Sequence, residues 1–361
     1  MSRLAIALLG KRDEPTDAVT EYCQYLATAL HPHEIQLEIH RVSWEIHGWP
    51  DSFQTLKLLA RQWRDKWVLV QYTALAWSAR GFPQKVLHAL NILKFAGARM
   101  GIVFHDAEPY PGTRPIDLLR RFVQIRTMRR ALSLADLAIF TVAPEKLSWL
   151  LDVPPHAAFI PVGPNLPIPA EFPVISRQKP VPTIGVFSIT GGESGGRETQ
   201  VIVAAVRYAA KKLGRLRLSV FGRHAELREA TLREGLRDLP VELSVEGVVN
   251  PNQVVQKLSA CDVLLFVRGS ISTRRGSAIA GIACGLPVIA YSGSETAAPI
   301  TDAGVVLVSP EQPDDLSTAL VRVLSDSAYQ TDLAARSRAA YRAHFAWSVI
   351  AARFSVLLNA R

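Results

Sequence analysis

The stretch RGSAIAGIACGLPVIA at residues 275–290 has the residue types of an anion-binding turn. Arginines and small residues stand directly before an apolar run that is typical of a buried helix. The first amides of a helix and its dipole attract phosphate groups. A capped helix with solvated arginines is the alternative interpretation. The candidate anion ligands are Arg274, Arg275, Gly276, Ser277 and Ala278.

A second loop, ITGGESGGRETQ at residues 189–200, places four glycines between a predicted strand and a helix expected to begin near Glu198. Glycines let a backbone approach a ligand closely, and Arg197 adds a fixed cation, so a diphosphate would fit. The spacing matches neither the Walker A nor the dinucleotide fingerprint. A surface loop without a ligand is an equal alternative. The candidate ligands are Gly191, Gly192, Gly196 and Arg197.

Two further polar residues follow predicted strands. His105 opens a loop after a buried strand and is a candidate to hydrogen-bond a sugar or an acceptor hydroxyl, while a structural histidine bonded to a neighbouring carbonyl is the alternative. Arg223 follows the strand 216–222 and is a candidate to approach a nucleobase, with an ordinary surface turn as the alternative. Both interpretations therefore stay open for each residue.

The elements that position these residues are short β-branched runs that alternate with helical patterns. This alternation is typical of parallel sheets covered by helices on both faces. Ligands of such sheets bind beyond the carboxyl ends of the strands, where the candidate loops lie. The predicted strands are 4–9, 36–42, 67–72, 101–105 and 137–142 in the first half, and 183–189, 216–222, 241–247, 263–269, 287–293 and 304–310 in the second.

A proline-rich segment separates the two series of strands, and 361 residues are too many for one ordinary core. We therefore predict an α/β fold with two doubly wound parallel-sheet domains facing a cleft. The predicted bounds are 1–165 for an acceptor-side domain, 166–182 for a linker, 183–335 for a nucleotide-sugar domain and 336–361 for a helix that crosses back to the first domain.

The composition limits the classes of molecule that the protein is expected to bind. The formal net charge of +9 favours an acidic partner, and the absence of an aromatic-basic platform argues against nucleic acid. Three cysteines and nine histidines lack paired spacing, so no metal site is expected. No long apolar run or signal peptide is visible, which predicts a cytoplasmic protein. The arginine-rich segment 114–132 is interpreted as a solvated helix, with peripheral contact to an anionic membrane as the alternative.

Several runs of the sequence resemble glycosyltransferase family 4. They are CDVLLFVRGS, AIAGIACGLPVIAYSGSE and ITDAGVVLVSPEQPDDLSTALVRVL, preceded by VEGVVNPNQVVQKLSACD. The resemblance implies the two-domain GT-B fold and transfer of a sugar from a nucleotide donor with retention of configuration at the sugar. It implies a glycan, lipid-linked or small-molecule acceptor, and no cofactor beyond the donor.

The resemblance also assigns roles to individual residues. Arg197 falls at the position of the family's phosphate-binding lysine, and His105 lies where a functional histidine is expected. Asp17 and Ala18 stand in the first loop, where the family usually has a glycine. Arginines and backbone amides can stabilise a departing diphosphate without a metal ion. We therefore predict Arg197 and His105 as the catalytic residues of a metal-independent enzyme.

The chain departs from the family at two acidic positions. Ser272 and Ala280 stand where two glutamates that contact the donor are usual. Glu295 follows the strand 287–293 and is the acid predicted nearest to this altered site, where it is a candidate to contact the donor sugar or ribose. The departure keeps two alternatives open, a catalytically degenerate GT-B protein that serves as a partner subunit or nucleotide-sugar binder, and a sugar-nucleotide epimerase.

Overall fold

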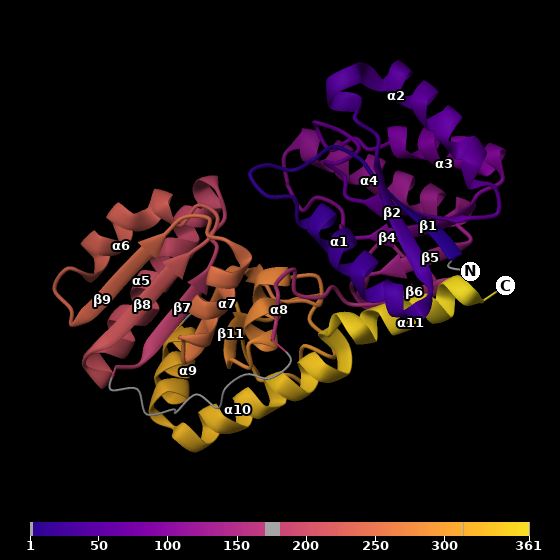
Figure 1. Ribbon diagram of the computed structural model, residues 1–361. Coiled ribbons are helices and arrows are strands. Elements are labelled where there is room, and N and C mark those ends of the chain that lie inside the picture. The colour runs from indigo at the N-terminus through magenta and orange to yellow at the C-terminus, as the bar shows by residue number, and fades with distance from the viewer. Residues whose placement is uncertain (1–2, 170–180, 313, 361) are drawn as a thin grey trace. The chain divides into compact units, whose positions relative to one another are not determined.

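The computed structural model describes residues 3–169, 181–312 and 314–360. The chain divides into two compact units, Met1–Pro161 with Trp347–Arg361, and Val162–Ala346. Each unit contains a six-stranded parallel sheet with helices on both faces (Figure 1). The predicted α/β fold with two doubly wound sheets is therefore confirmed. Most of the predicted linker, at 170–180, lies outside the described residues.

The sheet of unit 1 has the strand order β2-β1-β3-β4-β5-β6, and all its neighbours are parallel. Five of the strands match predicted runs, whereas the short edge strand β6 was not predicted because it offers only three residues between prolines. The strands are β1 (Arg3–Leu9), β2 (Ile35–Arg41), β3 (Trp67–Tyr72), β4 (Arg99–Phe104), β5 (Leu137–Phe140) and β6 (Ala157–Phe159).

Helices cover both faces of this sheet. Figure 1 shows α2, α3 and α4 side by side on one face, in agreement with their mutual packing, while α1 packs against α11. Apolar side chains from both layers fill the core, among them the fully buried Trp77 and Phe104. The helices are α1 (Ala18–Leu30), α2 (Trp44–Ala60), α3 (Lys85–Ala96), α4 (Pro115–Leu134) and α11 (Trp347–Asn359).

The C-terminal helix α11 is part of unit 1. Trp67 on β3 donates a hydrogen bond from Nε1 to the Leu358 carbonyl at 3.0 Å, and Trp347 stacks on Tyr25 of α1. The predicted crossing helix 336–361 is not one element, because a π-turn and an extended Ala346 separate α10 from α11. Residues up to Ala346 stay with unit 2.

The sheet of unit 2 has the order β12-β11-β10-β7-β8-β9, again parallel throughout. The chain runs from β7 outward to β9, and then returns to β10 on the other side of β7. This reversal creates a topological switch point between β7 and β10. The strands are β7 (Thr183–Phe187), β8 (Leu216–Phe221), β9 (Val241–Glu246), β10 (Val263–Ser270), β11 (Val288–Tyr291) and β12 (Val305–Val308).

The helices of unit 2 also flank both faces, with α5 packed against α6 and α9, and α8 packed against α7 and α10. Helix α5 begins at Gly192 and not near Glu198, so the glycines predicted to form an open loop lie within its first turns. The helices are α5 (Gly192–Leu213), α6 (Glu229–Leu236), α7 (Pro251–Ser259), α8 (Gly276–Ala283), α9 (Asp314–Ser325) and α10 (Ser327–Ala340).

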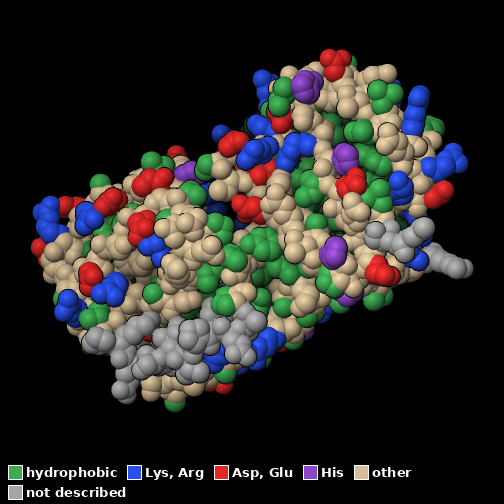
Figure 2. All heavy atoms as spheres, viewed as in Figure 1, with side chains coloured by type: hydrophobic (Ala, Val, Ile, Leu, Met, Phe, Trp, Pro, Cys, Tyr) green, Lys and Arg blue, Asp and Glu red, His purple; other side chains and the backbone are tan. Residues whose placement is uncertain are grey.

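Acidic and basic side chains are interspersed over both units on the face shown in Figure 2, so the net positive charge forms no continuous basic patch there. Within the described ranges, none of the helices has the length and apolar character needed to span a bilayer.

Phe354→Ala is expected to destabilise unit 1, because Phe354 on α11 is fully buried. Loss of a buried phenylalanine costs about 3–5 kcal/mol of unfolding free energy. All seven tryptophans lie within 1–161 or 347–361, so urea unfolding followed by tryptophan fluorescence reports on unit 1. Val356→Ala on the same helix is the control, because Val356 is 69% exposed. Equal midpoints for the two variants would contradict the assignment of α11 to this core.

Candidate functional site

The loops after β7 and β8 are joined by hydrogen bonds at the carboxyl edge of the unit 2 sheet. The Ser188 amide donates to the Phe221 carbonyl at 2.7 Å, and the Ile189 amide donates to the Arg223 carbonyl at 2.9 Å. The Arg223 amide in turn donates to Ser188 Oγ at 3.3 Å. Ser188 has a φ of 68°, a left-handed conformation that these bonds hold in place. Arg223 is thereby fixed beside the loop that leads into α5.

The first turns of α5 depend on two glycines. Gly192 has a φ of 63°, and a Cβ at Gly195 would lie 1.8 Å from the Thr190 carbonyl oxygen. The buried Glu198 closes the turn, because its Oε2 accepts the Thr190 amide at 2.8 Å. Arg197 is exposed beside it, and its Nη2 contacts Ser194 Oγ at 3.4 Å. The phosphate-binding and catalytic roles of Arg197 stay predictions.

Arg268 at the end of β10 is a cation that sequence reasoning missed. Its Nε is buried and has no hydrogen-bond partner among the residues that the structure describes. Burial lowers the pKa of Arg268 below its usual range, the Glu198 carboxylate opposes this effect, and the Arg223 charge adds to it. Three charged side chains, from β10, α5 and the loop after β8, therefore interact electrostatically at the carboxyl edge of the unit 2 sheet. The sequence signal was a cation directly after the buried run VLLFV of a central strand.

The loop after β10 is tied to the loop after β11 by a charge pair. Arg274 donates from Nε to Glu295 Oε2 at 2.7 Å and from Nη2 to Glu295 Oε1 at 2.7 Å. Ser272 donates from Oγ to Glu295 Oε2 at 2.9 Å. A carboxylate thus reaches Ser272 from the next strand of the sheet. Ala280, at the second altered position, is buried in the apolar face of α8.

The pairing of Arg274 with Glu295 determines the charge state of Glu295. Burial raises the pKa of Glu295, but the hydrogen bonds and charge of Arg274, with Ser272 and Arg275, outweigh it and hold the pKa below its usual range. Glu295 is therefore ionised at neutral pH and compensates Arg274. Two donors of Arg274, on Nε and Nη2, are directed at this carboxylate, and its predicted role as a phosphate ligand stays a prediction.

The backbone amides at the start of α8 differ in whether they already donate a hydrogen bond within the protein. The Ala278 amide donates to the Arg275 carbonyl at 2.9 Å, which makes it part of the turn. The predicted anion contact of Ala278 would have to compete with this bond, so Gly276 and Ser277 remain the amide candidates. Arg275 lies close enough to Glu295 to lower the pKa of that carboxyl.

In unit 1, the loop after β1 borders a pocket of about 360 Å³, here called the polar pocket. Asp17 caps α1 by accepting the Thr20 amide at 3.1 Å and forms an ion pair with Arg41 at 2.9 Å. Ala18 is the first residue of α1, so the chain needs no left-handed residue there. The polar pocket is lined by Leu9, Gly10, Lys11, Arg12, Asp13, Asp17, Ala18, Val19, Arg41, Gln71, Thr73, Leu75, Ala76, Ala79 and Asp106.

His105 lies behind the wall of this pocket. Its Nε2 is 2.8 Å from Oε1 of Gln71, which lines the pocket, and its ring meets Tyr22 edge to face. Burial lowers the pKa of His105 to about 4, against a smaller raising effect of Asp17. The imidazole is therefore neutral at neutral pH and can act there through hydrogen bonding, not as a charged acid.

The two comparisons that use sequence each match part of the chain. Residues 195–326 match the family described as "Glycosyl transferases group 1". A GDP-mannose-dependent monoacylated alpha-(1-6)-phosphatidylinositol monomannoside mannosyltransferase of Corynebacterium glutamicum is 26% identical over 137 residues. This match spans 36% of the chain and 36% of that relative. The predicted resemblance is confirmed within these limits.

Solved structures resemble the chain over nearly its whole length. Sucrose-phosphate synthase of Thermosynechococcus elongatus has a TM-score of 0.74 at 18% identity and is covered over 98%, with 99% of this chain aligned. HepE of Anabaena, solved with UDP and glucose, has a TM-score of 0.66 at 14% identity and 99% coverage of both chains. These likenesses support the GT-B fold.

Glu295→Gln is expected to lower the unfolding free energy of unit 2 by about 2 kcal/mol at pH 7, because it leaves the mostly buried Arg274 uncompensated. The difference in unfolding free energy between the wild type and the variant should be fully present above the pKa of a glutamate in the unfolded chain, about 4.3. It should vanish as the pH falls through the lower pKa of Glu295 in the folded protein. Unfolding followed by circular dichroism at several pH values measures it.

Glu234→Gln is the matched control, since its partner Arg237 and Glu234 itself are both about two-thirds exposed. An exposed pair contributes about 0.5 kcal/mol or less. A loss for Glu295→Gln no larger than that of the control would show that the Arg274 pair does not stabilise unit 2.

Proposed function

We propose that this chain transfers a sugar from a nucleoside diphosphate donor that binds at the switch point of unit 2. The observation that carries the proposal is Arg268, whose Nε is buried without a hydrogen-bond partner among the described residues and whose charge interacts with those of Glu198 and Arg223. These three residues lie at the carboxyl ends of the strands, where parallel sheets bind ligands. The group 1 match over residues 195–326 supports the same conclusion.

The chemistry required of the site is stabilisation of a leaving diphosphate. Negative charge develops on the phosphate oxygens as the bond to the sugar breaks, and fixed cations stabilise it most where water is scarce. Arg268, Arg223 and the amides of Gly276 and Ser277 are the groups proposed to do this, with Arg197 at the rim. We propose that the reaction proceeds without a metal ion and, on the family resemblance, with retention at the sugar.

A binding protein without transfer activity is the second candidate function. Ser272 and Ala280 motivate this candidate, because they stand at two positions where the family usually has a glutamate. The pairing of Ser272 with Glu295 supports transfer over loss of activity, since a carboxylate is retained at this corner. Release of nucleoside diphosphate from a donor sugar in the presence of acceptor separates the two candidates.

Arg268→Met is expected to weaken binding of the donor nucleotide roughly tenfold to hundredfold, because a hydrogen bond to a charged group contributes about 1.5–3 kcal/mol. A thermal-shift panel with UDP, GDP, ADP and dTDP identifies the base, and calorimetry then measures the affinity. Arg237→Met, which removes an exposed arginine of the same unit, should bind like the wild type. Absence of any nucleotide-induced shift in the wild type would overturn the proposed function.

Peripheral contact with an anionic membrane is proposed for the exposed face of α4. Leu118, Leu119 and Phe122 are 53–61% exposed, and Arg126 continues the same face toward the C-terminal half of the helix. Apolar side chains next to arginines suit the boundary between headgroups and acyl chains. Such a contact would hold the enzyme at a membrane surface, where a lipid-linked acceptor would be found.

Phe122→Ser is expected to lower the partition of the protein onto phosphatidylglycerol vesicles roughly tenfold, because an aromatic side chain no longer enters the interface. Co-sedimentation measures the partition, with phosphatidylcholine vesicles as the uncharged comparison. Leu58→Ser on α2 is the control, since Leu58 is 52% exposed and α3 separates α2 from α4. Equal sedimentation of the two variants would remove α4 as the contact.

A further inference from the structure

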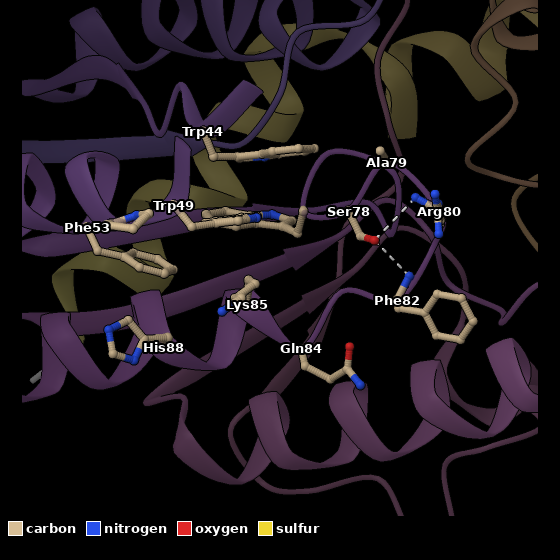
Figure 3. Close-up of a pocket in the computed structure, with 12 residues that line it drawn as sticks. Trp44, Trp49, Phe53, Ser78, Ala79, Arg80, Phe82, Gln84, Lys85 and His88 are labelled. Atoms are coloured by element: carbon tan, nitrogen blue, oxygen red, sulfur yellow. Dashed lines mark hydrogen bonds between the residues drawn. The ribbon is translucent and has the colours of Figure 1, made fainter. Parts of the chain in front are cut away.

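Unit 1 contains a second, larger pocket of about 850 Å³ that none of the roles above uses (Figure 3). It lies between the start of α2 and the segment that joins β3 to α3, beyond the carboxyl ends of β2 and β3. Aromatic residues dominate its wall, so it is here called the aromatic pocket. Trp44, Trp49, Phe53, Trp77 and Phe82 are its aromatic lining residues.

The aromatic wall depends on a break in α2 at Gly48. On an unbroken helix, Trp44 and Trp49 would point in widely different directions, because five residues correspond to about 140° of rotation. Gly48 has a φ of 75° and kinks the helix, and the two indoles stack with ring centroids 4.8 Å apart and planes only 6° apart. Phe53 continues the stack at 5.0 Å from Trp49. The result is an apolar wall of three stacked aromatic rings.

The opposite wall is held in place without a ligand. Ser78 Oγ accepts the Arg80 amide at 3.3 Å and the Phe82 amide at 3.0 Å, as the dashed lines in Figure 3 show. Gln124 on α4 donates to the Gly81 carbonyl at 2.9 Å. The loop is therefore anchored from both ends and from a neighbouring helix. A ligand would bind to a surface that is already formed.

The charged groups of the pocket have one sign. Arg80 and Lys85 line it, and no aspartate or glutamate is among the lining residues that the structure describes. Figure 3 shows Lys85 below the indole of Trp49, on the side away from Trp44. An occupant that uses both features must combine an apolar face with a negative charge.

The aromatic pocket adjoins the polar pocket. Ala79 lines both, and the Ala76 carbonyl accepts Trp44 Nε1 at 2.8 Å from one side and the Lys11 amide at 2.7 Å from the other. A ligand held against Trp49 can therefore extend past Ala79 toward Gln71 and Asp106.

We propose that the aromatic pocket binds a pyranose ring that carries an anionic substituent, as part of the acceptor. The axial C–H face of a pyranose is apolar and flat enough to stack on an indole, its hydroxyls can reach Ser78 and Gln84, and its anion can pair with Lys85 or Arg80. The proposal rests on the proposed glycosyl transfer, because it names the substrate that receives the sugar.

The test measures binding of four probes to the full chain by tryptophan fluorescence: glucose 6-phosphate, glucuronic acid, glucose and inorganic phosphate. A charged sugar is expected to bind at least tenfold more tightly than both glucose and phosphate. The phosphate and carboxylate probes also decide which anion is preferred. Equal binding of glucose or of inorganic phosphate, or no binding of any probe, would overturn the proposal.

Two variants assign the binding to this pocket. Trp49→Ala should weaken binding of the charged sugar roughly tenfold, and Trp49→Phe should restore part of it. Lys85→Met, at an exposed position where folding is not at risk, should reduce the preference for a charged sugar over glucose. Lys94→Met on the same helix but outside the pocket is its control. Unchanged binding in both Trp49→Ala and Lys85→Met would place the site elsewhere.

Nucleotide binding is measured on the same samples, so the two proposals fail separately. If a nucleoside diphosphate stabilises the protein and no charged sugar binds, the acceptor assignment is wrong while the proposed function stands. If no nucleotide binds, the proposed function fails whatever the sugars do.

Discussion

The carboxyl edge of the unit 2 sheet depends on compensating the charge of Arg268, whose Nε is buried at the end of a central strand. Arg268 follows five buried apolar residues of β10, and an unsolvated guanidinium Nε carries a free-energy cost unless opposite charge is near. Glu198 supplies that charge from α5, and it can do so because Gly195 lets the first turn of the helix approach the Thr190 carbonyl. The glycine-rich segment thus positions a carboxylate beside Arg268.

The same principle explains the altered acidic positions. The family that the chain resembles usually has a glutamate at the position of Ser272, and here the Glu295 carboxylate reaches Ser272 from the loop after β11 and accepts two hydrogen bonds from Arg274. Arg274 thereby ties the turn before α8 to the loop after β11. A sequence comparison position by position cannot detect such a relocation.

The strands, the order of elements and the loops that form the site were predictable, because parallel strands are read from uninterrupted β-branched runs such as VLLFV and their loops follow directly. The partners of individual side chains were not. Arg274 and Glu295 are separated by 21 residues, and their contact exists only because β10 and β11 are neighbours in the sheet. Likewise, the start of α5 at Gly192 depends on a left-handed glycine and on the bond from Thr190 to Glu198, neither of which leaves a periodic pattern.

The aromatic pocket shows why a glycine can matter as much as the aromatic residues it separates. Without the left-handed Gly48, α2 would carry Trp44 and Trp49 to different faces, and neither indole could form part of a continuous wall. A side chain at this position would be strained, so the stacking of the two indoles and the kink in α2 are gained or lost together. The Trp44 bond to the Ala76 carbonyl then fixes the wall to the loop that also borders the polar pocket. A single backbone conformation therefore couples the aromatic wall of one pocket to the polar groups of the next.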